Sequence, residues 1–94
     1  MIDLRTIYPL DRETILASVR KTHKVLTVQE DTRTGGVASE IAAIVNEEAF
    51  EDLDGPVLRL TAPDAPVPFA PALEDAHMPS VPEILRTARA LASY

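Results

Sequence analysis

Short apolar runs alternate with stretches of helical apolar spacing along the whole chain, and this alternation constrains the fold most. Ile2–Arg5, Lys24–Glu30 and Val57–Thr61 are expected to form strands, because each concentrates aliphatic side chains in a short run. Between them, apolar residues recur every three or four positions in Arg12–Thr22 and in Val37–Ala49, which predicts two amphipathic helices. Strands that alternate with helices predict an α/β fold with a mostly parallel sheet and right-handed crossovers.

Capping residues indicate where two of the helices begin. Asp11 is a good N-cap for the first helix, because its carboxylate can accept from backbone N–H groups that have no partner in the helix. Ser80 and Glu83 have the spacing of a capping box, and Pro82 stands in the first turn of the helix that follows. This last helix is expected to end near Ser93. The elements then follow in the order βαβαβα, and the whole chain of 94 residues forms a single domain.

Composition restricts the classes of function. Fifteen Asp and Glu against nine Lys and Arg give a formal charge of −6, which disfavours nucleic acid and anionic membranes as partners. The chain has no Cys, which excludes disulfides and thiol catalysis, and His23 and His77 lie at no metal-ligand spacing. No apolar run is long enough for a bilayer and no secretory signal opens the chain, so we expect an intracellular protein, cytoplasmic in a bacterium.

The segment 30–36, between the second strand and the second helix, is the first candidate site. Open α/β sheets bind ligands where a parallel strand ends, and glycines before a helix can bring N–H groups close to an anion. Glu30 and Asp31 would repel a phosphate, however, and the spacing matches neither a P-loop nor a dinucleotide fingerprint. We therefore expect Glu30, Asp31, Gly35 and Gly36 to form a structural turn, with partner contact the second interpretation and ligand binding the third.

A proline-rich connection, Ala62–Ser80, is the second candidate, since five of the eight prolines lie between residues 63 and 79. Proline fixes φ and removes a donor, so this segment is expected to be irregular or extended. One interpretation is a structural strap that packs Phe69 and Leu73 on the domain; the other is an interface anchored by Phe69. Both can hold together. The acidic side chains available to such an interface are Asp64, Glu74 and Asp75.

Three segments, in order, resemble one family: IDLRTIYPLD, then VQEDTRTGGVASEIAAIVNEEAF, then PVLRLTAPDAPVPFAPALEDAHMPSV before the closing helix. They resemble the C-terminal domain of the β subunit of the thiamine-diphosphate-dependent decarboxylating component of 2-oxo acid dehydrogenase complexes, of pyruvate or branched-chain type. Two alternatives stay open. One is the related C-terminal domain of transketolase or deoxyxylulose-phosphate synthase, which shares the Glu–x–x–x–x–Gly–Gly turn. The other is a stand-alone α/β domain that binds an anion or metabolite at Thr34–Gly36.

The resemblance implies a three-layer α/β/α sandwich on a mixed sheet, of which this chain would lack the first strands and the first helix. It also implies that thiamine diphosphate and magnesium belong to the parent enzyme and are held outside this chain. No residue here is therefore assigned a catalytic, cofactor-binding or metal-binding role, and the chain alone is expected to be inactive.

The partners that the resemblance implies are an α subunit and a second β subunit in an α2β2 assembly, and the subunit-binding domain of the dihydrolipoyl acyltransferase. That docking module is typically basic, which suits an acidic domain. The residues expected to make such contacts are Asp64, Phe69, Glu74, Asp75 and Tyr94 with its carboxylate. A strand missing beside Ile2–Arg5 would leave backbone groups unpaired, so this segment is expected to pair directly with Lys24–Glu30, or the chain to self-associate.

Overall fold

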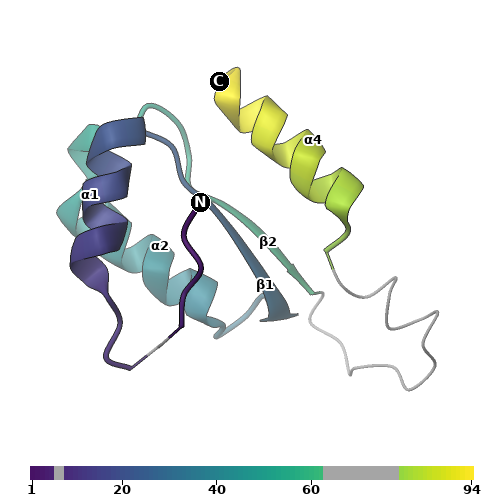
Figure 1. The fold of residues 1–94 in the computed structure, drawn as a ribbon, viewed down its shortest axis with the longest axis horizontal. Coiled ribbons are helices and arrows are strands. Elements are labelled where there is room, and N and C mark those ends of the chain that lie inside the picture. Colours follow the sequence, from purple (N-terminus) through teal and green to yellow (C-terminus); the bar gives the residue numbers. More distant parts are fainter. Residues whose placement is uncertain (6–7, 63–78) are drawn as a thin grey trace.

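The computed structural model describes residues 1–5, 8–62 and 79–94. Along them lie α1 (Arg12–Thr22), β1 (Leu26–Thr32), α2 (Val37–Glu48), a short 3-10 helix η1 (Phe50–Asp52), β2 (Leu58–Ala62) and α4 (Val81–Ala92). Helices α1 and α2 lie together on one side of the two strands and α4 lies on the other, which makes three layers (Figure 1). The predicted α/β class is confirmed, and so is the parallel pairing.

Helix α1 has the bounds predicted from its apolar spacing, because both of its ends are capped locally. The Asp11 carboxylate accepts from the Thr14 backbone N–H at 3.2 Å and from the Thr14 hydroxyl at 2.7 Å. At the other end His23 turns left-handed, with φ at 65°, and its N–H donates to the carbonyl of Val19 at 2.8 Å. The N-cap prediction for Asp11 is therefore confirmed.

The main core lies between α1 and α2. Val45 of α2 is fully buried there, and Val25 and Val57, at the starts of the two strand segments, pack against the cluster. Leu4 also packs on it from the N-terminal segment. The apolar stripes that predicted both helices are thus the surfaces that meet. The buried members are Ile15, Leu16, Val19, Ile41, Ile44, Val45 and Ala49.

The two strands give the sheet a separate face for α4. Successive side chains of a strand point to opposite faces, and Val25 and Val57 face the α1–α2 core. The residues that follow them, Leu26 and Leu58, therefore face α4. The pairs across the strands are Leu26 with Leu58, Thr27 with Arg59, Val28 with Leu60 and, after a shift in register, Thr32 with Ala62.

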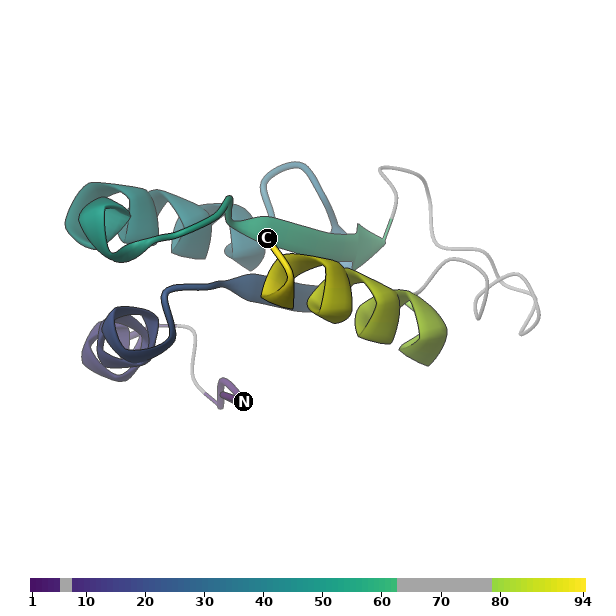
Figure 2. The same cartoon turned by 90° about the horizontal axis from the view of Figure 1, so that it is seen from above.

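Helix α4 begins and ends as predicted. Ser80 accepts from the Glu83 backbone N–H at 3.2 Å, its hydroxyl contacts the Glu83 carboxylate at 3.1 Å, and Ser93 forms the C-cap. Figures 1 and 2 both show α4 running alongside the strands in the opposite direction. The helix contacts β1. It rests on the sheet through the buried Leu91 and the half-buried Ile84, which lie seven residues apart on one side of the helix.

The strand expected at Ile2–Arg5 is wrong, since residues 1–5 carry no strand and the described sheet contains only β1 and β2. The segment is held through Leu4, which packs on the core, while Asp3 and Arg5 stay exposed and form an ion pair at 3.4 Å. A strand needs the backbone of a neighbour, and this short, half-charged run buries one side chain instead. The direct pairing expected with Lys24–Glu30 is wrong for the same reason, and β1 itself begins two residues later, at Leu26.

We predict that Asp11 makes the stability of α1 depend on pH. The Thr14 hydroxyl, and then the Thr14 N–H, lower the pKa of Asp11 below its ordinary value of 3.8. Because the folded-state pKa is depressed, the stabilisation is fully present above the unfolded-state value and is lost as the pH falls through the lowered one. Asp11→Asn should remove this part of the acid dependence, and Thr14→Val should shrink it. Unfolding by urea between pH 2 and 6 measures the effect; identical acid profiles for the three proteins would contradict it.

Candidate functional site

The turn between β1 and α2 lies at the carboxyl end of the parallel strands, where a ligand site was considered. Gly35 has a φ of +74°, a left-handed conformation that favours glycine, so this glycine is explained by the turn alone. Glu30 and Asp31 belong to β1, which continues to Thr32, so the turn begins later than expected. Among the residues expected to form it, only the two glycines lie in the turn itself.

The N-terminus of α2 is capped by a side chain from the neighbouring strand. Gly36 stands at the N-cap position and has no side chain to offer. The Gln29 side-chain oxygen of β1 accepts instead from the Ala38 backbone N–H at 2.9 Å. Sequence reasoning missed Gln29; the signal that could have found it is a glycine N-cap, which obliges another group to satisfy the first turn of the helix.

Two arginines tie the turn to β2 through backbone carbonyls. The Arg33 guanidinium donates to the Arg59 carbonyl, and the Arg59 guanidinium donates to the Arg33 carbonyl, both at 3.2 Å. The Arg59 guanidinium also donates to the Ser39 hydroxyl at 2.7 Å, and that hydroxyl donates to the Arg33 carbonyl at 3.3 Å. These contacts, together with the cap from Gln29, use the donors of this edge to hold the turn, which favours the structural interpretation over an anion site.

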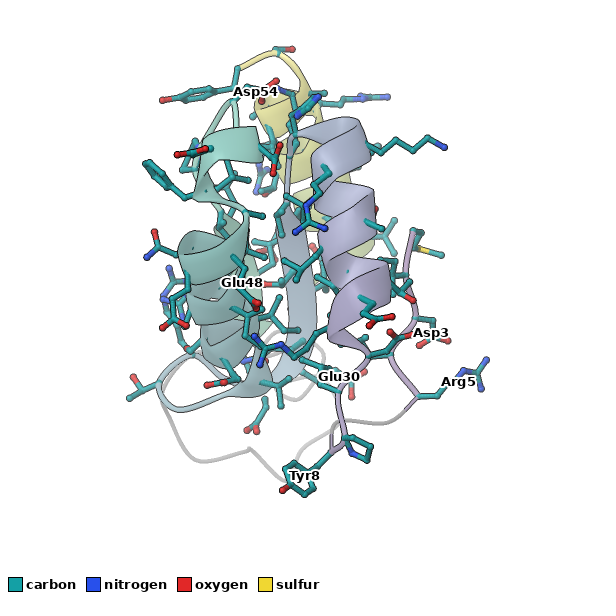
Figure 3. All side chains as sticks on the ribbon, turned by 90° about the vertical axis from the view of Figure 1, so that its left-hand side faces the viewer. Asp3, Arg5, Tyr8, Glu30, Glu48 and Asp54 are labelled. Carbon is teal, nitrogen blue, oxygen red and sulfur yellow. The ribbon has the colours of Figure 1, made fainter. Side chains whose placement is uncertain are left out.

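A row of ion pairs joins the α1 side of the molecule to α2 and η1. Arg12 pairs with Glu48, Arg20 with Asp52 at 3.8 Å, and Lys24 with Asp54. Figure 3 shows Glu48 and Asp54 on the face made by the two helices. The hydrogen bond and charge of Glu48 raise the pKa of Arg12, which therefore stays charged. Each pair is solvent-exposed and contributes about 0–1 kcal/mol, so the row orients the helices more than it stabilises them.

His23 is a structural residue at the corner between α1 and β1. Its Nδ1 contacts the Asp52 carbonyl at 2.7 Å, and its own carbonyl accepts from the Asp54 N–H at 3.0 Å. The corner therefore pins η1 and the loop after it to the end of α1. Among the described residues, no three His, Asp or Glu side chains converge in a way that could hold a metal ion. Nor does any described helix have the length and apolar character needed to cross a membrane.

The larger of the surface hollows has a volume of about 580 Å³ and lies between α2, η1 and the start of β2. Its walls are mostly apolar, with Glu51 and Asn46 as the polar contributions, and Phe50 stands 65% exposed beside it. It brings together no nucleophile with a base. The lining residues are Ala42, Asn46, Phe50, Glu51, Leu53, Gly55, Pro56 and Val57.

Among the residues expected to contact a partner, Tyr94 alone falls within the described part of the chain. It lies 74% exposed at the end of α4, and its N–H donates to the Leu91 carbonyl at 3.1 Å. The ring covers Gly55 so closely that a Cβ added there would lie 3.0 Å from the Tyr94 Cδ1. The other expected contacts, Asp64, Phe69, Glu74 and Asp75, lie outside the described residues, as does His77.

The fold and the paired parallel strands agree with a comparison to known families. The family described as transketolase, C-terminal domain, matches residues 1–84. The chain belongs to this family. The resemblance derived from the sequence is confirmed, and the related proteins narrow it further.

Relatives of this transketolase C-terminal domain are named as β subunits of 2-oxo acid dehydrogenases. The 2-oxoisovalerate dehydrogenase subunit beta of Bacillus subtilis is 45% identical over 95 residues, covering 100% of this chain and 29% of that protein. The pyruvate dehydrogenase E1 component subunit beta of the same bacterium is 42% identical over 94 residues, with the same coverage of 100% and 29%. The mitochondrial pyruvate dehydrogenase E1 component subunit beta-2 of Oryza sativa subsp. japonica is 47% identical over 89 residues, 95% of this chain and 24% of that protein.

The aligned stretch is the C-terminal part of these subunits. This transketolase C-terminal domain thus spans less than a third of the length of the curated relatives that it matches. The similarity therefore concerns one domain of a larger protein.

We predict that the turn depends on its left-handed glycine. Gly35→Ala should destabilise the domain by roughly 1–2 kcal/mol, because a Cβ is unfavourable at this φ, although the space around Gly35 is open. Gly35→Asn is the matched variant and should lose less, since asparagine tolerates the left-handed region. Urea unfolding of the three proteins measures the difference. Equal losses for alanine and asparagine would contradict the role assigned to φ.

Proposed function

We propose that this chain is a non-catalytic assembly domain of the β subunit of a thiamine-diphosphate-dependent 2-oxo acid dehydrogenase. The observation that carries the proposal is 45% identity over the full chain to a protein named as such a β subunit, of which it matches 29%. In this proposal the parent enzyme oxidatively decarboxylates pyruvate or a branched-chain 2-oxo acid. The domain contributes contacts between subunits rather than reacting groups.

The described residues do not fit a site for thiamine diphosphate and magnesium. A diphosphate needs free donors and a magnesium ion needs converging oxygen ligands. At the α2 N-terminus the Ala38 N–H is already bonded to Gln29, and no acidic trio converges elsewhere in the described residues. We therefore propose that the cofactor is held outside this chain, and no step of the chemistry passes through its residues.

The partners proposed are an α subunit, a second β subunit in an α2β2 assembly, and the subunit-binding domain of the acyltransferase. The chain carries a charge of −6, which favours encounter with a basic docking module. The exposed Tyr94, with its carboxylate, is proposed to lie at this contact together with the acidic side chains of the proline-rich segment. Those side chains are Asp64, Glu74 and Asp75.

The purified chain is predicted to show no turnover of pyruvate or of a branched-chain 2-oxo acid when supplied with thiamine diphosphate and Mg²⁺. Its thermal transition should also stay unchanged with the cofactor, whereas a ligand at a hundred times its dissociation constant would add about 2.7 kcal/mol. A coupled decarboxylation assay and a thermal shift measure the two. Turnover by the chain alone would refute the proposal, and a shift with inorganic phosphate would support the metabolite-binding alternative.

Charge reversal at Asp64 and Asp75 is predicted to weaken binding of the acyltransferase subunit-binding domain by about tenfold at low salt. The effect should shrink as ionic strength rises, because exposed charges are then screened. The matched control reverses Glu13 and Glu47, two exposed acids on α1 and α2, and should bind as the unaltered chain does. Calorimetry at two salt concentrations measures the difference; equal affinities for both double variants would count against this docking surface.

A further inference from the structure

One stripe of α4 is apolar but faces away from the sheet. The helix rests on β1 through Ile84 and Leu91. Val81 and Leu85, one turn apart, are nevertheless 77% and 48% exposed. Ala92 continues this line as an exposed residue, and Ala88 stands half-buried at its inner edge. Residues 81, 85, 88 and 92 follow the 4-3-4 spacing of a helix that packs against another helix.

The order of side-chain sizes along this stripe says what can cover it. The two larger residues, Val81 and Leu85, lie in the N-terminal half of the stripe, and the two alanines lie in the C-terminal half. If a second α4 runs antiparallel, Val81 lies opposite Ala92 and Leu85 opposite Ala88, so every large side chain meets a small one. A parallel pair would set large against large at one end and leave a gap at the other. Large against small is how packed helices interdigitate.

Charge does not oppose contact at this helix. The chain as a whole carries −6, whereas α4 contains Glu83, Arg86 and Arg89 and so carries a formal +1. Two acidic copies repel each other through the rest of their surface, and salt screens that repulsion. Val28 adds apolar area on the same face of the sheet, since it lies 47% exposed on the side that faces α4.

We propose that two copies of this chain pair through the exposed stripe of α4, antiparallel about a two-fold axis. Such an interface is self-complementary, as two-fold symmetry requires. Helix α4 has 12 residues and is about 18 Å long, so the contact is smaller than the ~1,000 Å² of a stable interface, and the pair is weak and concentration-dependent. The inference rests on the proposed assembly role and names one surface for it.

Cysteine placement tests the register, because the chain has no cysteine of its own. Val81→Cys and Ala92→Cys are prepared separately and treated with a thiol cross-linker about 8–10 Å long, which matches the distance between packed helix axes. A mixture of the two should give at least fivefold more covalent dimer than either alone, because the two copies of residue 81 stand about 16 Å apart in the pair. Phe50→Cys mixed with Ala92→Cys is the control and should not cross-link above background.

Sedimentation supplies the second readout on the unlabelled chain. The weight-average mass should rise with concentration and with salt, Leu85→Glu should abolish the rise, and Ala90→Glu, the same charge on the opposite side of α4, should leave it intact. Equal cross-linking by Val81→Cys alone, or dimerisation that survives Leu85→Glu, would overturn the proposal. Failure here with acyltransferase capture preserved rejects only the helix pairing, whereas the reverse outcome rejects the docking role and keeps the pairing.

Discussion

The contact between α1 and α2 is the interaction on which the rest of the molecule depends. Seven buried residues gather there, and a fully buried aliphatic side chain contributes about 1.5–3 kcal/mol, while each exposed ion pair above them adds at most about 1 kcal/mol. A two-stranded parallel sheet with both outer edges open would not hold by itself. Val25 and Val57 attach the strands to this helix pair, and the left-handed corner at His23 sets the angle at which β1 leaves it.

The parts of the fold that sequence could predict are those encoded within one or two helical turns. The bounds of α1 follow from Asp11 and from an apolar stripe, and the start of α4 follows from Ser80 with Glu83. The expected strand at Ile2–Arg5 failed because a strand is defined by a neighbour, and no local pattern says whether that neighbour is within reach. Leu4, packed on the helical core, shows what such a segment does when backbone pairing is absent.

The candidate site divides in the same way. The left-handed turn at Gly35 could be predicted, because glycine pairs mark such turns. The exchange of hydrogen bonds between Arg33 and Arg59 could not, because it depends on which residue of β2 comes level with the end of β1. Gln29 became a cap only through the direction in which its strand faces α2. Surfaces that meet other proteins are harder still, because exposed apolar residues such as Leu85 look locally like any residue at the edge of a core.

The crossover from β1 through α2 to β2 has a consequence for the order of events in folding. Twenty-five residues separate Thr32 from Leu58, so the two strands can only find each other after the chain between them has shortened into helix. The contacts between α1 and α2 span a shorter loop than those that close the sheet, and loop-closure entropy favours forming them earlier. The sheet is thus the last layer to be completed from within, and its edges are the part of the molecule most open to being completed by another polypeptide.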